Sequence, residues 1–387
     1  MISCQKSAFS LDPQVHYLNC AYMSPLSKRV EETGITALRS KRAPATITPD
    51  DFFDVPERVR ETFAGLIGGS AKDVALFPSV SYGIATTARN LHPVTGQNIV
   101  VLHEQFPSNV YTWMRLAEES GADLRTVYRP AADTLSDVHE AWNEAILSAI
   151  DVSTAIVAVP IVHWADGTLF DMAAIRRRCD RFGAALIVDG TQSVGALPFS
   201  VASVRPDALI TAGYKWLFGP YSCALGWMGP RFAEGIPIEE NWINRKGSEQ
   251  FAGLVDYESD YQPGARRYDV GEKSNFILMP MLLAALEQVS EWTPAAIQEY
   301  TRQLVAPFEE RILNAGYHLA PAHTRGAHLF GVRLPGGQSV EAVRRALSER
   351  NVSVSVRGNA IRIAPHVYND EADVWALMDA LESAAIS

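Results

Sequence analysis

Cysteine is scarce in this sequence, and the scarcity argues against a zinc-binding protein and against a disulfide-stabilised protein. The four cysteines, Cys4, Cys20, Cys179 and Cys223, show neither C-x-x-C spacing nor a nearby pattern of histidine ligands. Their spacing therefore predicts neither a zinc site nor a disulfide framework. We expect reduced thiols, a cytoplasmic protein and no metal.

Positive charge and long apolar runs are also lacking. The chain has 34 Lys and Arg against 44 Asp and Glu, a formal net charge of −10, which is unsuited to non-specific binding of nucleic acid. No apolar run approaches the roughly 18 residues of a membrane-spanning helix, and no basic segment followed by an apolar run opens the chain. Hydrophobic residues still make up 47% of the 387 residues. We expect a folded chain of roughly two domains.

From about residue 50 onward, short β-rich runs alternate with helical patterns. Runs rich in Val, Ile or Leu predict strands at 98–103, 124–128, 155–162, 185–189 and 208–211. Between two of them, Asp171 is placed to cap a helix that Gly183 ends. This alternation is typical of a doubly wound α/β lobe, in which helices connect parallel strands.

The pattern changes after residue 230. The stretch 239–275 is rich in Gly, Pro, Tyr and Arg without clean periodicity, and loops of this length are usually functional. Helical patterns follow at 280–292, 295–314 and 339–350, then a short strand pair within 352–365 and a last helix from 370 onward. These elements predict a smaller α+β lobe.

Two polar residues follow predicted strands where ligands bind in open α/β sheets. Asp189 ends the apolar run ALIVD, and the alternative role for it is capping the next loop. Lys215 lies 26 residues later, between Tyr214 and Trp216 in a turn flanked by glycines. A desolvated lysine forms imines with aldehydes or ketones, whereas a surface lysine packing its stem on neighbours is the alternative.

A strand-end Asp, a Gln three residues later and a Tyr-Lys pair after the next strand together resemble one family. It is the class V aminotransferase superfamily of fold-type I pyridoxal-phosphate enzymes, which includes cysteine desulfurases, kynureninase and isopenicillin N epimerase. The resemblance covers nearly the whole chain, through YLNCAYMSPL, FPSVSYG, HEQFPSNVYTW, VDGTQSVG, AGYKWLFGPY, YDVGEKSNF and IRIAPHVYN.

The resemblance implies a fold and a domain division. We expect an α/β fold-type I structure, with a large doubly wound lobe around a mainly parallel seven-stranded sheet and a smaller α+β C-terminal lobe. The large domain that binds pyridoxal phosphate would span 16–255. The small domain would span 256–387, with residues 1–15 packed on it.

The resemblance also implies roles for the strand-end residues. Lys215 would form an imine with the cofactor aldehyde and carry the α proton of the substrate, while Asp189 would pair with the protonated pyridine nitrogen and stay ionised. Gln192 would bond the phenolic oxygen of the cofactor, and Tyr214 its phosphate. The family's phosphate cup at a helix N-terminus matches Ser79, Val80 and Ser81, for which an ordinary N-cap is the alternative.

Aromatic residues are expected on the face of the cofactor. We choose Phe106 for stacking, because kynureninase-like relatives carry Phe-Pro-Ser or Phe-Pro-Thr there, whereas desulfurases carry a histidine that acts in acid–base steps. His163 and Trp164, at the end of the next strand, are expected to line the same pocket. For His163, a purely structural role is the alternative.

Contacts to the substrate and to a second subunit are implied further along the chain. Arg362 matches the family arginine that binds the substrate α-carboxylate, with Arg357 as a nearby competitor, and Asn19 is a second expected substrate contact. The family sends the YDVGEKSNF segment to the cofactor phosphate of its partner, which implies a homodimer with shared sites. The matching residues are Gly271, Ser274 and Asn275.

The absence of a cysteine in the C-terminal part of the sequence narrows the set of candidate reactions. Desulfurases need a nucleophilic cysteine shortly before the carboxylate-binding arginine, and no cysteine follows Cys223, so a desulfurase is disfavoured. A transaminase or a C–S lyase acting by β-elimination is favoured for an amino-acid substrate. An epimerase or a kynureninase-like hydrolase is the alternative. A non-catalytic or nucleotide-binding α/β protein is the rival from another class, although G-x-G-x-x-G is absent after the first strand.

Overall fold

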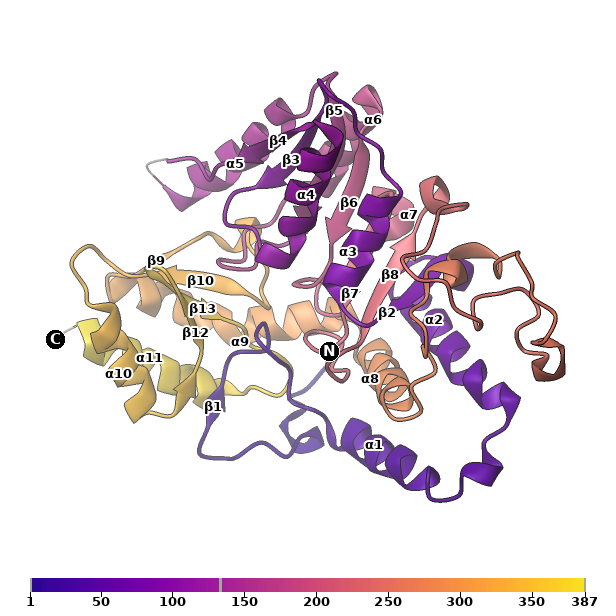
Figure 1. Ribbon diagram of the computed structural model, residues 1–387. Coiled ribbons are helices and arrows are strands. Elements are labelled where there is room, and N and C mark those ends of the chain that lie inside the picture. The colour runs from indigo at the N-terminus through magenta and orange to yellow at the C-terminus, as the bar shows by residue number, and fades with distance from the viewer. Residues whose placement is uncertain (1, 132–133, 386–387) are drawn as a thin grey trace.

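A seven-stranded sheet forms the centre of the large lobe (Figure 1). The structure is a computed structural model that describes residues 2–131 and 134–385. The strands lie in the order β2-β8-β7-β6-β5-β3-β4, and only β8 runs antiparallel to its neighbours. The expected α/β fold with a mainly parallel seven-stranded sheet is confirmed. The strands are β2 (Val74–Phe77), β3 (Asn98–Leu102), β4 (Asp123–Val127), β5 (Thr154–Pro160), β6 (Ala185–Asp189), β7 (Ala208–Ala212) and β8 (Ala224–Met228).

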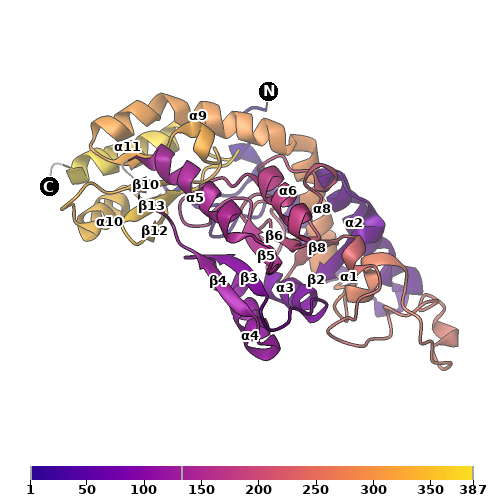
Figure 2. The same cartoon turned by 90° about the horizontal axis from the view of Figure 1, so that it is seen from above.

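Helices cover both faces of this sheet (Figure 2). Along β6, Leu186 and Val188 face a hydrophobic cluster that includes α5, α6 and α8, whereas Ala185 and Ile187 face a second cluster with α3 and α4. Because both faces of the inner strands are buried, these strands are nearly continuous apolar runs. The helices of this lobe are α1 (Lys28–Ser40), α2 (Asp54–Ile67), α3 (Val80–Arg89), α4 (Tyr111–Ser120), α5 (Leu135–Ala149), α6 (Met172–Phe182), α7 (Val201–Val204) and α8 (Leu278–Trp292).

The α6 helix begins and ends as its sequence predicts. The Asp171 side chain accepts a hydrogen bond from the backbone N–H of Ala174 at 2.8 Å, so it is the N-cap. Gly183 follows the helix with a φ of 74°, the left-handed conformation that glycine adopts most readily. The helix is thereby fixed between β5 and β6.

The C-terminal part of the chain builds a smaller sheet with its own core. The order of this antiparallel sheet is β12-β13-β10-β9, and a separate parallel pair joins β1 to β11. Its elements are β1 (His16–Tyr17), α9 (Pro294–Asn314), β9 (His318–Leu319), β10 (Phe330–Arg333), α10 (Val340–Glu349), β11 (Val352–Ser353), β12 (Ser355–Arg357), β13 (Ala360–Ile363) and α11 (Glu371–Ala385).

The hydrophobic clusters show where the two cores meet. The α8 helix packs with α1 and α2 in the cluster of the large lobe, and Ile297 at the start of α9 belongs to the same cluster. Leu304, further along α9, belongs to the cluster of the small lobe. The division at residues 255 and 256 therefore stays a prediction, and the cores change over within α9.

The N-terminal residues contact both lobes. The Lys6 amine pairs with Asp370, which directly precedes α11 of the small lobe, at 2.8 Å. The Phe9 ring lies 5.6 Å from that of Phe218, which belongs to the core of the large lobe. None of the described helices is both long and apolar enough to cross a membrane.

Candidate active site

A cavity of about 280 Å³ opens at the carboxyl edge of the parallel strands. This edge is where ligands bind in open α/β sheets, because the loops that follow neighbouring strands converge there. The walls come from the segments that follow β2, β3, β5, β6 and β7 and from the turn that precedes β8. They comprise residues 78–81, 105, 106, 108, 109, 160, 162, 164, 189, 191, 192, 212, 214, 215 and 221–223.

Lys215 lies in the turn after β7, and its side chain enters this cavity. The residue is 6% exposed, and its Nζ lies 5.6 Å from the ring centroid of Phe106 and 5.5 Å from that of Tyr214. Burial, reinforced by the charge of Arg362 and partly opposed by that of Asp189, lowers the pKa of Lys215 to about 8. A substantial neutral fraction of the amine therefore exists near physiological pH.

Asp189 ends β6 and lines the same cavity. One carboxylate oxygen accepts the Thr191 amide at 2.9 Å, and the other accepts the Asn109 side-chain amide at 3.3 Å. Asn109 is itself held by Trp113, whose indole N–H donates to it at 3.1 Å. Burial raises the pKa of Asp189, although the bonds from Thr191 and the charge of Lys215 oppose this rise. A cationic ligand group beside Asp189 would favour its ionised form.

Gln192 is fixed at both ends of its amide. Its Nε2 donates to the Ala21 carbonyl at 3.1 Å, and its Oε1 accepts the Trp216 indole N–H at 2.9 Å. Because an amide nitrogen carries two protons, one donor of Gln192 remains for a ligand in the cavity. Tyr214 lines the cavity next to it, with its ring 4.6 Å from that of Tyr221.

The turn that joins β2 to α3 forms another wall of the cavity. Ser79 is in extended conformation, and its hydroxyl accepts the Tyr82 amide at 3.2 Å, so it is an N-cap. The same hydroxyl lies 2.9 Å from that of Ser81, and Ser79, Val80 and Ser81 all line the cavity. A helix N-terminus with free N–H groups and hydroxyls is suited to bind a phosphate.

Aromatic side chains build the opposite wall, and one expected residue is missing from it. Phe106 and Trp164 line the cavity with their rings perpendicular and 5.5 Å apart. His163 points the other way: its ring lies 5.0 Å from that of Trp142, and its Nδ1 lies 3.1 Å from Asp166. Because neighbouring residues of an extended segment face opposite sides, Trp164 enters the cavity and His163 does not. Placing His163 in the pocket was wrong.

The expected substrate residues lie behind Trp164 and do not line the cavity directly. Arg362 is 2% exposed, and it donates to the Trp164 carbonyl at 3.0 Å and to the Ser355 hydroxyl at 3.2 Å. The same hydroxyl donates to the Asn19 side chain at 2.9 Å. The guanidinium of Arg357, the competitor, lies 5.3 Å from the ring centroid of Trp164.

Ser274 and Asn275 do not reach this cavity in the described part of the chain. The Ser274 hydroxyl donates to the Phe52 carbonyl. The Asn275 side chain accepts the amides of Ile277 and Leu278 at 3.1 and 2.9 Å, and so caps the start of α8. Their expected contact with the phosphate of a partner subunit stays a prediction, as does that of Gly271, whose amide donates to Glu239.

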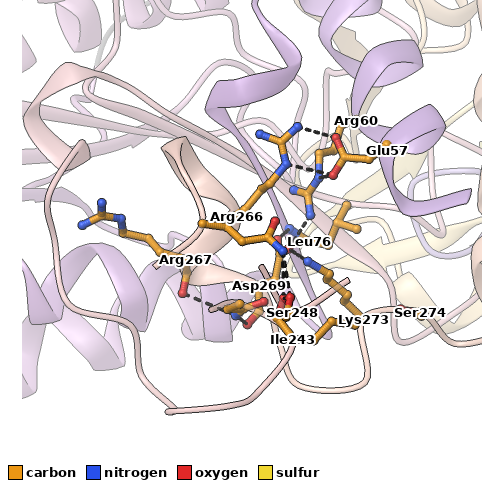
Figure 3. Close-up of polar contacts among 12 residues, drawn as sticks. Glu57, Arg60, Leu76, Ile243, Ser248, Arg266, Arg267, Asp269, Lys273 and Ser274 are labelled. Carbon is orange, nitrogen blue, oxygen red and sulfur yellow. Dashed lines mark hydrogen bonds and ion pairs between the residues drawn. The ribbon is translucent and has the colours of Figure 1, made fainter. Parts of the chain in front are cut away.

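A buried charge network attaches this segment to the edge of the sheet (Figure 3). Asp269 pairs with Arg60 and with Lys273, the latter at 2.8 Å, and accepts the Leu76 amide at 2.9 Å. The Val270 amide donates back to the Leu76 carbonyl at 3.0 Å. Burial alone would raise the pKa of Asp269, but the charges of Arg60 and Lys273 outweigh it and lower the pKa. Because β2 leads directly into the Ser79 turn, the network fixes one wall of the cavity.

The comparisons with known proteins agree with this geometry. The family model for aminotransferase class V matches residues 49–376. This chain belongs to the class V aminotransferases. The cofactor of this class V aminotransferase is pyridoxal 5'-phosphate, and a cavity with a buried lysine, a buried carboxylate and a helix N-terminus fits such a group.

Relatives of this class V aminotransferase span several reactions. It is 26% identical to an uncharacterized aminotransferase of Bacillus subtilis, over 85% of this chain and 84% of that one. It is also 26% identical to isopenicillin N epimerase of Streptomyces clavuligerus, over 96% of each chain. A solved structure of a C-DES mutant with glycine covalently linked to its pyridoxal phosphate superimposes with a TM-score of 0.83 at 17% identity, covering 98% of this chain and 99% of that one. Cysteine desulfurases are also related, so the absence of desulfurase activity stays a prediction.

Asn109 and Cys223 are among the cavity residues that the sequence analysis did not single out. Asn109 supports Asp189 from the short 3-10 helix Pro107–Asn109, and its position three residues after Phe106 is the only sequence signal for it. Cys223 lines the cavity, because the turn before the antiparallel strand β8 ends at the same edge of the sheet.

Proposed function

We propose that this protein transforms an α-amino acid by transamination or by β-elimination of a sulfur leaving group, with Lys215 as the base. The observation that carries the proposal is that Lys215 is the single amine, and Asp189 the single carboxylate, among the described residues that line the cavity. Both reactions can proceed with one base, which takes the proton from Cα.

The residues of the cavity have distinct tasks in this proposal. The bound cofactor supplies an aldehyde carbon and an electron-withdrawing ring. Lys215 would hold the group through its neutral amine and would later carry the Cα proton at Nζ. Asp189 places its negative charge where the ring nitrogen is protonated, and Asn109 keeps the carboxylate in position. The Ser79 and Ser81 hydroxyls and the start of α3 bind the phosphate, while Phe106 covers the ring and excludes water.

Proton delivery separates the candidate reactions. In transamination, Lys215 returns the proton to a neighbouring carbon; in β-elimination, a thiolate leaves from Cβ. Epimerisation by two bases needs a second donor on the other side of Cα. Where a desulfurase relative carries a histidine, this chain has Phe106, which has no proton to give. This supports the two one-base reactions over the epimerase that is a relative of this chain.

The environment of Cys223 supports the same choice over a desulfurase. Burial raises the pKa of the Cys223 thiol to about 12, so at neutral pH it is protonated and poorly nucleophilic. Cys4 is exposed but lies at the N-terminus, and the other two cysteines are buried outside the residues that line the cavity. None of the four is placed to attack a substrate sulfur as a thiolate.

A homodimer with shared sites is part of the proposal. Ser274 and Asn275 of this chain lie away from their own cavity, which is consistent with a role at the cavity of a second subunit. Mixing an Asn275→Ala chain with a Lys215→Ala chain tests it. If the sites are shared, the mixed dimer has one site in which both residues are intact, so the mixture is more active than either variant alone. If the sites are not shared, the activity of the mixture is only the average of the activities of the two variants.

Exchange of the Cα proton is the first test of the reaction. The holoenzyme is incubated with single amino acids in D2O, and deuterium at Cα is measured by mass spectrometry. Transamination then produces a keto acid only with an acceptor keto acid present, whereas β-elimination releases ammonia and a thiol without one. Lys215→Ala should lose exchange, and the exposed Lys72→Ala is the matched control. Exchange that survives in Lys215→Ala would contradict the proposal.

A further inference from the structure

Two arginines project from the same face of a hairpin beside the active-site cavity. The strands β12 and β13 pair antiparallel, with Ser355 opposite Arg362 and Arg357 opposite Ala360. Side chains alternate along a strand, so Ser355 and Arg357 share one face, and Arg362 shares it as the cross-strand partner of Ser355. Arg357 and Arg362 are therefore diagonal neighbours, within reach of one elongated ligand.

Both guanidinium groups lie against the cavity wall. Their central carbons are 5.3 Å (Arg357) and 6.0 Å (Arg362) from the ring centroid of Trp164, which lines the cavity. Trp164 also contacts Phe106, and the Lys215 amine lies 5.6 Å from the Phe106 ring. The hairpin thus places its two positive charges at the aromatic wall of the cavity that contains the reactive amine.

Neither guanidinium has an anionic partner among the described residues. The other buried arginines, Arg60, Arg176 and Arg325, each form an ion pair with an Asp or Glu. Arg362 is equally buried and has none, and the Nε atoms of both Arg357 and Arg362 are buried without a hydrogen-bond partner. A buried charge without a partner is costly, and so the pair is suited to receive anions from a ligand.

The charges of the surrounding residues agree with this geometry. Repulsion from Arg357 adds to burial in lowering the pKa of Arg362 to about 10, and both arginines lower that of Lys215. The described residues that line the cavity contribute one carboxylate, Asp189, at the end of β6. Positive charge on the hairpin side is therefore not neutralised by the chain itself.

We propose that the substrate is an α-amino acid with a second acidic group, which Arg357 binds while Arg362 binds the α-carboxylate. This inference rests on the proposed function, because it names the substrate class of the same site. A guanidinium presents a planar fork that matches a carboxylate, and one carboxylate on each arginine satisfies the unpaired donors. Trp164 lies against both groups and holds them on one side of the substrate. Arg357 then determines which amino acids enter, and Lys215 acts on them.

Binding of unreactive acids tests the assignment without any turnover. The holoenzyme is titrated by calorimetry with succinate and glutarate, and with propionate and butyrate as acids of one charge. We expect the dicarboxylates to bind about 10- to 100-fold more tightly. Arg357→Gln should remove this preference and leave binding of the monocarboxylates within about twofold. Arg357→Lys should restore part of it, because it returns the charge without the fork.

Two controls show whether a loss of affinity in Arg357→Gln comes from the binding site, from misfolding or from the loss of any positive charge. Arg345→Gln removes an exposed positive charge from α10 and should leave the preference intact. The melting temperature of each variant shows whether it is folded, and the partial rescue by Arg357→Lys would not follow from a purely structural role. Equal affinity of the unaltered protein for mono- and dicarboxylates would overturn the proposal. An equal loss of affinity for both kinds of acid in Arg357→Gln would overturn it as well.

Kinetics distinguish failure of this inference from failure of the proposed function. For Cα deuterium exchange, Arg357→Gln should raise KM for aspartate or glutamate much more than it changes KM for alanine. If exchange proceeds with alanine and Arg357→Gln changes nothing for the acidic amino acids, the function stands and the substrate class is wrong. If the dicarboxylates need Arg357 to bind but no amino acid exchanges its proton, the binding site stands and the proposed function is wrong.

Discussion

The lowered pKa of Lys215 gives a prediction with a definite sign. Burial and the charge of Arg362 shift it from 10.5 to about 8. At pH 7, about one tenth of an amine with that pKa is neutral, compared with about 0.03% of an ordinary lysine, so the reactive form is enriched roughly 300-fold. The neutral form becomes the majority above about pH 8 and is lost as the pH falls below that value.

Two substitutions should move this pKa in opposite directions. Arg362→Gln removes a repelling positive charge, so the pKa of Lys215 should rise. Asp189→Asn removes an attracting negative charge, so it should fall. At an effective dielectric constant near 20, a unit charge about 12 Å from a titrating group changes the pKa of that group by about one unit. At pH 7, Arg362→Gln should therefore reduce the neutral fraction about tenfold.

Trace acetylation measures the neutral amine directly. The cofactor-free protein is treated with a small amount of acetic anhydride at a series of pH values, and the peptide that contains Lys215 is quantified by mass spectrometry. The pH midpoint of Lys215 acetylation should lie near pH 8 in the unaltered protein. The midpoint should be higher in Arg362→Gln and lower in Asp189→Asn. A midpoint near that of free lysine in the unaltered protein, or one that neither substitution moves, would refute the electrostatic reasoning.

Three further substitutions test other parts of the site. Lys215→Ala should abolish the lysine–cofactor bond that borohydride reduces, and a labelled lysine elsewhere in the peptide map would contradict its assignment. Asp189→Asn should still bind the cofactor and lose about 100-fold or more in turnover, measured as Cα exchange in the loaded enzyme. Asp269→Ala leaves Arg60 and Lys273 buried without their carboxylate, so the free energy of unfolding should fall by about 3–5 kcal/mol in a denaturant titration; an unchanged transition would mean that the network contributes nothing.

The sequence predicted five of the seven strands of the large sheet and missed β2 and β8, which are neighbours at one edge. Each of the five predicted runs lies within two residues of an observed strand. The inner strands are apolar almost throughout because they lie between two helical layers, whereas the edge strand β4 is partly exposed and mixes polar with apolar residues. β2 has only four residues, and β8 is interrupted by Gly226. That glycine has a packing reason, since a β-carbon there would lie 2.5 Å from the Phe77 ring on β2.

The site was predictable where a residue directly follows a strand. Asp189 and Lys215 could be placed because the predicted strands deliver their ends to one edge of the sheet. Ser79 follows the missed strand β2 and was placed by the family resemblance. The orientation of a loop residue was not predictable in the same way. His163 is one position from Trp164 and faces the opposite side, and Asn109 supports Asp189 only because a 3-10 turn brings it there.

Under the proposed substrate assignment, the choice of substrate depends on the small sheet more than on the large one. The lysine, the strand-end acid and the phosphate cup are arranged by the parallel sheet, and relatives with different reactions share that family. The Ser355, Arg357 and Arg362 face belongs instead to the β12–β13 hairpin, which meets the cavity through Trp164. A hairpin with a two-residue turn places Arg357 by its register, so a shift of one residue would turn that guanidinium to the opposite face. Under the proposed assignment, changes in this hairpin alter substrate selection without moving the residues of the parallel sheet, although the charge of each arginine also acts on the pKa of Lys215.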